Sequence, residues 1–393
     1  MPAAAIEWQS ACEQSEGEDE VGKASQFPGV DRVVDRAVDR TIVGANILIK
    51  LNGELVYDRQ AGFFDREADW PMAPHTIFRL ASVTKPMVSV AALAMVEAGR
   101  MRLDDPVTRY LPDFRPRLAD GSAPPITISQ LMNHTAGLSY DLDNGNGRPA
   151  AGGTGPSDFD LAENIRRIAA LPLAFPPGAG WRYSVAIDVL GGVMEVADGR
   201  SLPEIVKARV THPLGMADTA FRPVDPSRLA VVYADGTPPT RMGNIERVKD
   251  GEGFIEFWTG RAFDPTAFPS GGAGMIGTAE DFLVFLEAMR QGGRPLLSPA
   301  SMPLLAEAHT VDIDPAPSGQ GYSHGWSVYR DPTVQKAPCK PGTWAWGGIY
   351  GHQWYVDPAS GLTIVIFTNT AIEGCVGAFP KDIFQAVYED LGL

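Results

Sequence analysis

The residues best suited to chemistry in this sequence are a serine and a lysine three positions apart, Ser82 and Lys85, in the segment RLASVTKPMVSVAALAMVEAG. If a helix begins near Ser82, the two side chains share a face and lie within reach of each other. A serine hydroxyl is a weak nucleophile that must pass its proton to a base, and a lysine can act as that base when burial keeps it neutral. The N-terminus of a helix also favours negative charge developing on the serine oxygen. The structural alternative is that Ser82 caps the helix and Lys85 is solvated.

Two further segments could complete a catalytic site. Tyr183 follows a Pro/Gly-rich loop and begins a helix-like run, so its phenol could project into a cleft and move protons beside a lysine. The segment WAWGGIYGHQW reads as a strand in which Gly347 and Gly348 indicate close approach of a ligand or of another backbone. The backbone N–H groups of Ser82 and Ile349 could then form an oxyanion hole. In the structural alternative, Tyr183 is a packing residue and the two glycines form a bulge in a tryptophan-rich strand.

In this combination and order, the sequence resembles the serine β-lactamase and penicillin-binding-protein superfamily on its class C side, and most closely the family VIII carboxylesterases. The stretch SVTK from Ser82 to Lys85 matches the S-x-x-K motif, Tyr183 matches the second-motif tyrosine, and Trp346-Gly347-Gly348 stands where β-lactamases carry Lys-Thr-Gly. The segments LMNHTAGL and PSGGAGMIGTAEDF support the resemblance, which spans about residues 25–390.

The resemblance implies a role for each matched residue. Ser82 would be acylated, Lys85 and Tyr183 would move protons, and the N–H groups of Ser82 and Ile349 would hold the oxyanion. It also implies an α/β (α+β) β-lactamase-like fold, with a central antiparallel sheet flanked by helices and a mostly helical inserted domain. No cofactor and no metal are expected.

Two departures from the β-lactamase pattern bear on the substrate. The tyrosine motif reads Tyr183-Ser184-Val185 and lacks the asparagine that β-lactamases place two residues after the tyrosine. Trp346 replaces the lysine whose charge would pair with the carboxylate of a β-lactam or a peptide terminus. We therefore expect a small, neutral, short-chain carboxylic ester as substrate. The residues expected to contact it are Trp346, Gly347, Gly348 and Tyr350.

Other functions stay open at this stage. A β-lactamase or D-amino-acid peptidase is disfavoured by the two departures, whereas an acyltransferase would use the same residues as an esterase. A binding or sensing protein that kept the fold and lost turnover is the third possibility. His134 and His352 are expected to make structural hydrogen bonds, because the sequence has no G-x-S-x-G elbow. The remaining histidines show no paired ligand spacing, so no metal site is expected.

The flanking segments predict how these residues are positioned. Valines at helical spacing from Val30 to Val38 predict an amphipathic helix, and the next residues predict two strands joined at Asn52-Gly53. The C-terminal part predicts strands around a turn at 357–361 and a helix from about Gly377 to Leu391. We therefore expect both chain ends to share one antiparallel sheet covered by terminal helices. The predicted division is a flexible acidic tail at 1–23, an α/β domain at 24–118 and 265–393, and a mostly helical insertion at 119–264.

Composition limits the possible cellular compartment and the possible classes of partner. The chain has 393 residues, a formal net charge of −15 and 44% hydrophobic residues, so it can bury a large core but would repel nucleic acids and anionic lipid surfaces. Three widely spaced cysteines do not form a disulfide framework. These features, with no signal-like start, predict a cytoplasmic protein with no nucleic-acid and no membrane partner. The small-molecule ester expected as its partner follows from the resemblance. The oligomeric state is unknown at this stage.

Overall fold

A computed structural model describes residues 26–143, 145, 149–251, 253–310, 313 and 319–393. The acidic tail predicted at 1–23 lies outside the described residues. Within them, no helix combines the length and the apolar character needed to cross a bilayer.

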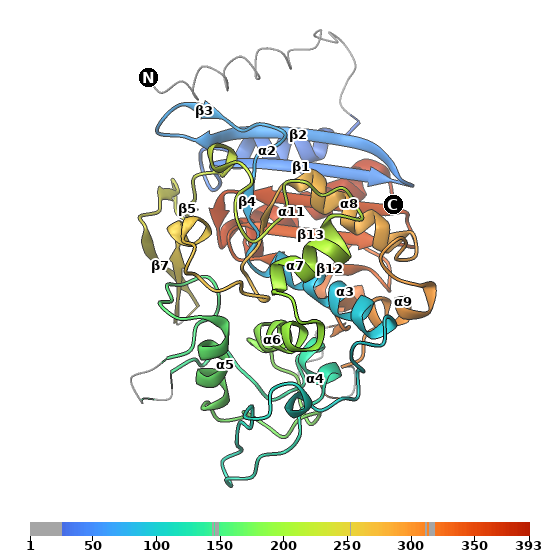
Figure 1. The fold of residues 1–393 in the computed structure, drawn as a ribbon. Helices are drawn as coiled ribbons and strands as arrows, with labels where there is room; N and C mark the ends of the chain where they lie inside the picture. The colour runs from blue at the N-terminus through green and yellow to red at the C-terminus, as the bar shows by residue number, and fades with distance from the viewer. Residues whose placement is uncertain (1–25, 144, 146–148, 252, 311–312, 314–318) are drawn as a thin grey trace.

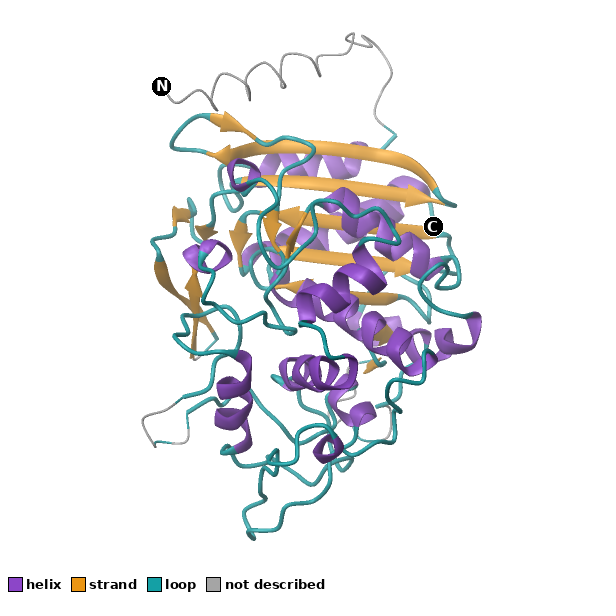
Figure 2. Cartoon of the chain, viewed as in Figure 1, coloured by secondary structure: helices purple, strands orange, loops and turns teal. Residues whose placement is uncertain are grey.

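An eight-stranded antiparallel sheet forms the centre of the molecule (Figures 1 and 2), in the order β10-β11-β12-β13-β14-β1-β2-β3. The strands are β1 Gly44–Leu51, β2 Glu54–Asp65, β3 Trp70–Pro71, β10 Gln320–Tyr322, β11 Ser327–Tyr329, β12 Trp344–Gly348, β13 His352–Asp357 and β14 Leu362–Thr368. Strand β1 pairs with β14, with Ile47 opposite Ile366. The prediction that the two chain ends share one antiparallel sheet is therefore confirmed.

The turn between β1 and β2 falls at the predicted dipeptide. Asn52 and Gly53 adopt φ values of 53° and 91°, the left-handed region that a tight hairpin turn requires. The N–H of Asn52 also donates to the carbonyl of Gly361 at 2.8 Å, which ties this turn to the turn between β13 and β14.

Alternate side chains of the sheet face two different layers. One face, including Ile47 and Ile364, packs against the terminal helices α2 (Pro28–Ala37) and α11 (Ala378–Leu391). The other face, including Leu48 and Phe367, belongs to a cluster that also contains α3 (Thr84–Glu97) and α8 (Ala279–Arg290). Thr278 caps α8 by accepting the N–H of Asp281 at 3.2 Å. The helix α3, which carries Lys85, thus packs against this second face of the sheet.

The described residues of 119–264 combine helices with small strands and occupy the lower part and the left side of Figure 1. They comprise α4 Ile128–Met132, α5 Leu161–Ala169, α6 Ala186–Asp198, α7 Leu202–Val206, a π-helical turn η3 at Lys207–Thr211, the short strands β5 Tyr233–Ala234 and β6 Thr240–Arg241, the hairpin of β7 Ile245–Asp250 and β8 Gly253–Trp258, and a 3₁₀ turn η5 at Thr259–Phe263. The main hydrophobic cluster continues from α3 into α4, α5 and α6. The β-lactamase-like fold class is confirmed, and the domain boundaries stay a prediction.

Candidate active site

Ser82 lies in a tight turn between a strand and a helix. The 3₁₀ turn η1 (Ala81–Val83) follows β4 (Phe78–Arg79) and runs directly into α3. Ala81 adopts φ = 45°, a left-handed conformation that is costly for a residue with a Cβ and is typical of functional turns. Val83 occupies the N-cap position of α3, and no side chain caps that helix. The alternative that Ser82 serves as a helix cap is therefore wrong.

Lys85 is buried, with no exposed surface, at the first turn of α3. Its Nζ donates to the carbonyl of Gly272 at 2.7 Å, to Ser82 Oγ at 3.1 Å and to the hydroxyl of Tyr140 at 3.1 Å. All three acceptors lie within hydrogen-bond distance of the amine. The alternative of a solvated lysine is wrong as well, because the surrounding helices enclose the side chain and the serine lies within hydrogen-bond reach.

Two tyrosines approach Lys85 in different ways. The Tyr183 ring faces the amine, with 4.6 Å from Nζ to the ring centroid, and its hydroxyl accepts the indole N–H of Trp346 at 3.4 Å. Tyr140 instead places its hydroxyl on Lys85. Tyr140 is absent from the residues singled out in the sequence, although it follows the quoted segment LMNHTAGL by only two positions. No periodicity could assign it a direction, because it lies in a loop.

Burial controls the protonation of Tyr140. The residue is 37% exposed, yet its hydroxyl contacts the fully buried Lys85. Desolvation first, and then the nearby Tyr183, raise the pKa of the Tyr140 phenol well above its ordinary value. Tyr140 is therefore a neutral phenol at physiological pH.

An aromatic cluster surrounds these two tyrosines. Trp346 lies 4.9 Å from Tyr183 between ring centroids and 5.1 Å from Tyr322. His134 lies 4.8 Å from Tyr183 by the same measure. The cluster provides apolar walls with few charges, which suits a neutral organic group.

The two glycines of β12 bring that strand against the Ser82 turn. A Cβ at Gly348 would lie 2.2 Å from the carbonyl oxygen of Leu80, a distance at which only glycine fits. The predicted close approach of another backbone is therefore confirmed, and it places residue 349 beside the turn that carries Ser82. The hydroxyl of Tyr350 lies instead 3.5 Å from the carbonyl of Trp258, so the structure does not bring Tyr350 into the aromatic cluster.

The two candidate histidines are buried. His352 Nε2 lies 2.8 Å from the carbonyl of Arg79, and burial lowers its pKa to about 4. His134 Nδ1 lies 3.3 Å from Ser184 Oγ, and burial followed by the charge of Lys85 lowers its pKa well below the usual value. Both rings are thus neutral, and their hydrogen bonds agree with the expected structural roles.

A buried carboxylate that the sequence analysis also missed supports the carbonyl that binds Lys85. Asp188 Oδ1, on α6, accepts the hydroxyl of Ser270 at 2.5 Å and the N–H of Gly272 at 3.3 Å. Burial raises its pKa, whereas the hydrogen bond from Ser270 and the charge of Lys85 act in the opposite direction. The sequence signal was weak, since Asp188 looks like an ordinary acidic residue in the first turn of a helix.

Comparisons with known proteins identify the family of the chain. A family model described as Beta-lactamase matches residues 30–377. The chain is 45% identical to Esterase EstB of Burkholderia gladioli, covering 93% of this chain and 96% of that protein. It is 28% identical to the lovastatin esterase of Penicillium rubens, covering 71% and 72% of the two chains.

A solved structure extends the likeness to three dimensions. EstCE1, described as a hydrolase with promiscuous acyltransferase activity, superposes with a TM-score of 0.86 at 40% identity, covering 93% of this chain and 98% of that one. The resemblance predicted from the three motifs is confirmed. The chain belongs to the beta-lactamase family.

Proposed function

We propose that this chain is a serine carboxylesterase that hydrolyses small neutral esters through an acyl-enzyme on Ser82. The observation that carries the proposal is the contact between a half-buried serine hydroxyl and a fully buried lysine in a turn with left-handed backbone at Ala81. The esterase activity of the relative at 45% identity supports the same reaction class.

In the first half of the reaction, Ser82 Oγ attacks the ester carbonyl carbon and its proton passes to the Lys85–Tyr183 pair. The N–H groups of Ser82 and Ile349 stabilise the oxyanion of the tetrahedral intermediate. The C–O bond to the alcohol then breaks, and the alcohol leaves with the proton. In the second half, water adds to the acyl group, and Ser82 regains its proton as the carboxylic acid leaves.

The wall of the site favours neutral substrates. Trp346 offers an indole next to Tyr183 where β-lactamases carry a cation, so a substrate carboxylate would find no charged partner there. Val185 is fully buried and stands at the N-cap of α6, so it offers no amide group to a β-lactam or a peptide. We therefore propose Trp346, Gly347 and Gly348 as substrate contacts and keep Tyr350 as a weaker candidate. A cytoplasmic location also stays a proposal.

Acyl transfer is the second candidate, favoured by one observation: EstCE1, 40% identical, is described as having promiscuous acyltransferase activity. Transfer needs only that an alcohol or amine replace water at the acyl-enzyme, so it uses the same residues. Adding a primary alcohol to the assay and measuring the new ester against the free acid tests it directly.

The test of the main proposal is intact-protein mass spectrometry after mixing the protein with a serine-reactive phosphonate, together with turnover of an activated butyrate ester. We expect one adduct, mapped to Ser82, and faster hydrolysis of the butyrate ester than of a succinate monoester of the same alcohol. Ser82→Ala should abolish both adduct and turnover. Ser89→Ala, a change of another serine on α3, should leave both unchanged. Substantial turnover by Ser82→Ala would contradict the nucleophile, and a folded protein with neither adduct nor turnover would favour the sensor.

A further inference from the structure

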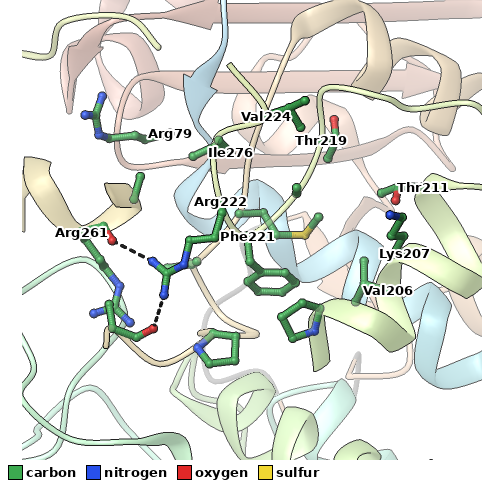
Figure 3. Close-up of a pocket in the computed structure, with 18 of the residues that line it drawn as sticks. Arg79, Val206, Lys207, Thr211, Thr219, Phe221, Arg222, Val224, Arg261 and Ile276 are labelled. Carbon is green, nitrogen blue, oxygen red and sulfur yellow. Dashed lines mark hydrogen bonds between the residues drawn. The ribbon is translucent and has the colours of Figure 1, made fainter. Parts of the chain in front are cut away.

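A cavity of about 620 Å³ is lined mainly by the segments 203–224 and 258–276 (Figure 3). Ser82, Lys85, Tyr183 and Trp346 are not among the described residues that line it. Ala273 and Gly274 do line it, and they directly follow the Gly272 carbonyl that binds Lys85. The volume is within the range of small-molecule sites in proteins.

Most of the cavity wall is apolar. Buried hydrophobic side chains contribute from three separate segments, with Phe221, Phe268 and Met275 among them. The Phe221 ring stands at the centre of Figure 3 and faces the space between Arg222 and Val206. A ligand there would bury an apolar body.

The charged residues of the wall are nearly all cations. Arg79, Lys207, Arg222 and Arg261 line the cavity, and Glu204 is the single carboxylate among the described lining residues. The excess of basic residues in the cavity wall is the reverse of the excess in the whole chain, which has 48 acidic and 33 basic residues. Glu204 is exposed and is already hydrogen-bonded to Ser201.

Two of these arginines lie close together without an acidic partner. Arg222 donates to the carbonyls of Arg261 at 3.1 Å and Ala267 at 2.8 Å, as the dashed lines in Figure 3 show. Arg261, only 8% exposed, donates to Ser157 Oγ at 2.9 Å and to the carbonyl of Phe268 at 2.7 Å. In the part of the chain that the structure describes, no carboxylate forms an ion pair with either guanidinium.

Backbone carbonyls satisfy some of the donors but do not neutralise the charge. Burial lowers the pKa of Arg261 to about 10. The charge of Asp188 opposes this shift, as do Tyr350 and Asp264, whereas the neighbouring Arg222 adds to it. A buried guanidinium charge such as that of Arg261 is costly unless an anion accompanies it, and the half-buried Arg222 places a second positive charge beside it. Each guanidinium has five N–H donors, so both retain donors for such an anion.

We propose that this cavity binds an apolar monocarboxylate, with its carboxylate at Arg222 and Arg261 and its hydrocarbon body along Phe221, Phe268 and Met275. Guanidinium groups match the two oxygens of a carboxylate, and the apolar wall excludes a ligand that is polar throughout. The residues that carry the proposal do not include Ser82, Lys85, Tyr183 or Trp346, although Tyr350, kept above as a weaker substrate contact, also lines this cavity.

The test is calorimetric titration of the full protein with octanoate after Ser82 has been capped by a phosphonate, so that the catalytic pocket is occupied. If the adduct does not form, Ser82→Ala replaces it. We expect one binding site, with octanoate bound at least about tenfold more tightly than octan-1-ol, a difference that corresponds to about 1.4 kcal/mol. No octanoate binding to the capped protein, or equal binding of the alcohol and the carboxylate, would overturn the proposal.

Matched variants locate the site. Arg222→Gln should weaken octanoate binding about tenfold or more. Arg59→Gln should leave it unchanged, because Arg59 is a similarly half-buried arginine that pairs with Asp31 and Asp35 on the far side of the sheet. Ala220→Leu, which narrows the cavity without changing charge, should weaken octanoate and octan-1-ol alike. Unchanged octanoate affinity in both cavity variants would overturn the assignment, and the carboxylate–alcohol comparison stands even if one of them fails to fold.

Discussion

Two tyrosines lie beside Lys85, and their different contacts indicate different roles in the reaction. Tyr140 accepts an N–H from Lys85 and keeps its own proton, because desolvation raises its pKa. Tyr183 presents its ring to Lys85, and its hydroxyl accepts the indole N–H of Trp346. We therefore infer that Tyr140 positions Lys85, whereas Tyr183 exchanges protons during the reaction.

This division predicts unequal losses in two conservative variants. Tyr140→Phe removes one of three acceptors from Lys85 and should lower kcat about tenfold, since a hydrogen bond to a charged group contributes about 1.5–3 kcal/mol, only part of it specific to the transition state. Tyr183→Phe should lower kcat by roughly 100-fold or more. Steady-state kinetics with the butyrate ester checks both variants.

A double variant provides the control. Combining Lys85→Ala with Tyr183→Phe should cost little more than Lys85→Ala alone, because residues that act as one unit are not additive. Additive losses, or a larger loss for Tyr140→Phe than for Tyr183→Phe, would reverse the assignment.

What the sequence could predict of the site depended on local spacing. Ser82 and Lys85 could be predicted from the sequence, because a spacing of three residues along a helix or a 3₁₀ turn places two side chains close together. Gly348 could be predicted because a glycine inside a strand indicates close approach of another group. Tyr140 and Asp188 reach Lys85 only through loops at 133–143 and 270–275, whose paths depend on tertiary packing. No periodicity encodes such a path, so their contacts became visible only in the folded chain.

At the scale of elements, the loop from Ser270 to Met275 lies between α6 and α3 and is hydrogen-bonded to both helices. Asp188 on α6 holds the Ser270 hydroxyl and the Gly272 N–H, and the Gly272 carbonyl in turn accepts from Lys85 on α3. A Cβ at Gly272 would lie 2.6 Å from Asp188 Oδ2, so the carboxylate packs directly on the loop backbone. The direction of the Gly272 carbonyl therefore depends on a side chain that touches no substrate.

This arrangement predicts that Asp188→Asn acts on catalysis more than on binding. We expect kcat to fall roughly 10- to 100-fold with KM changed less than about threefold, because the lysine loses its alignment while the aromatic walls stay. Ser270→Ala should move kcat in the same direction by a smaller factor. Steady-state kinetics with a neutral ester measures the split between kcat and KM.

Asp105→Asn is the matched control. Asp105 is also buried, at 6% exposure against 0% for Asp188, and its carboxylate accepts hydrogen bonds from Tyr110 and Arg109 away from the site. This variant should lower the thermal midpoint and leave kcat unchanged. If Asp188→Asn merely lowered the thermal midpoint as well, Asp188 would be a structural residue and not a positioning one.

Element types were more predictable than element connections. The terminal helices and the β1–β2 turn follow from periodicity and from Asn52-Gly53, and the structure confirms them. The pairing of β5 with β15 joins residues 233–234 to 370–371 across more than 100 positions, and the residues concerned carry no pattern of their own. Long-range pairing of short strands is therefore the part of this fold that local signals leave undetermined.

At the scale of the whole molecule, the central sheet and its covering layers bury histidines as neutral rings. His352 lies under β4 with its Nε2 on the Arg79 carbonyl, and His324 contacts Ser129 on α4. Burial lowers the pKa of both to about 4. Between pH 6.5 and 4 the unfolded chain binds a proton at each position and the folded chain does not, so each contribution to stability is lost as pH falls through that window.

The half-buried carboxylate of Glu280 opposes this trend. Desolvation raises the pKa of Glu280 to about 7, so its contribution to stability is lost as pH rises from its ordinary value of 4.5 towards 7. The pH dependence of the intact protein is thus a sum of opposing terms. Single variants separate these contributions to stability, because each variant removes one titratable group and leaves the others in place.

We predict that His352→Gln, whose amide can still donate to the Arg79 carbonyl, loses less stability on acidification than the parent protein. The folded pKa of about 4 against 6.5 unfolded implies that the parent loses about 2 kcal/mol more than the variant between pH 7 and pH 5. Urea unfolding at both pH values measures this difference. Glu280→Gln should shift the pH dependence in the opposite direction, since it removes a group that destabilises the fold as pH rises. An equal loss in His352→Gln and in the parent would mean that His352 takes up its proton in the folded protein, and the β4–β13 contact would then tolerate an imidazolium beside the turn that carries Ser82.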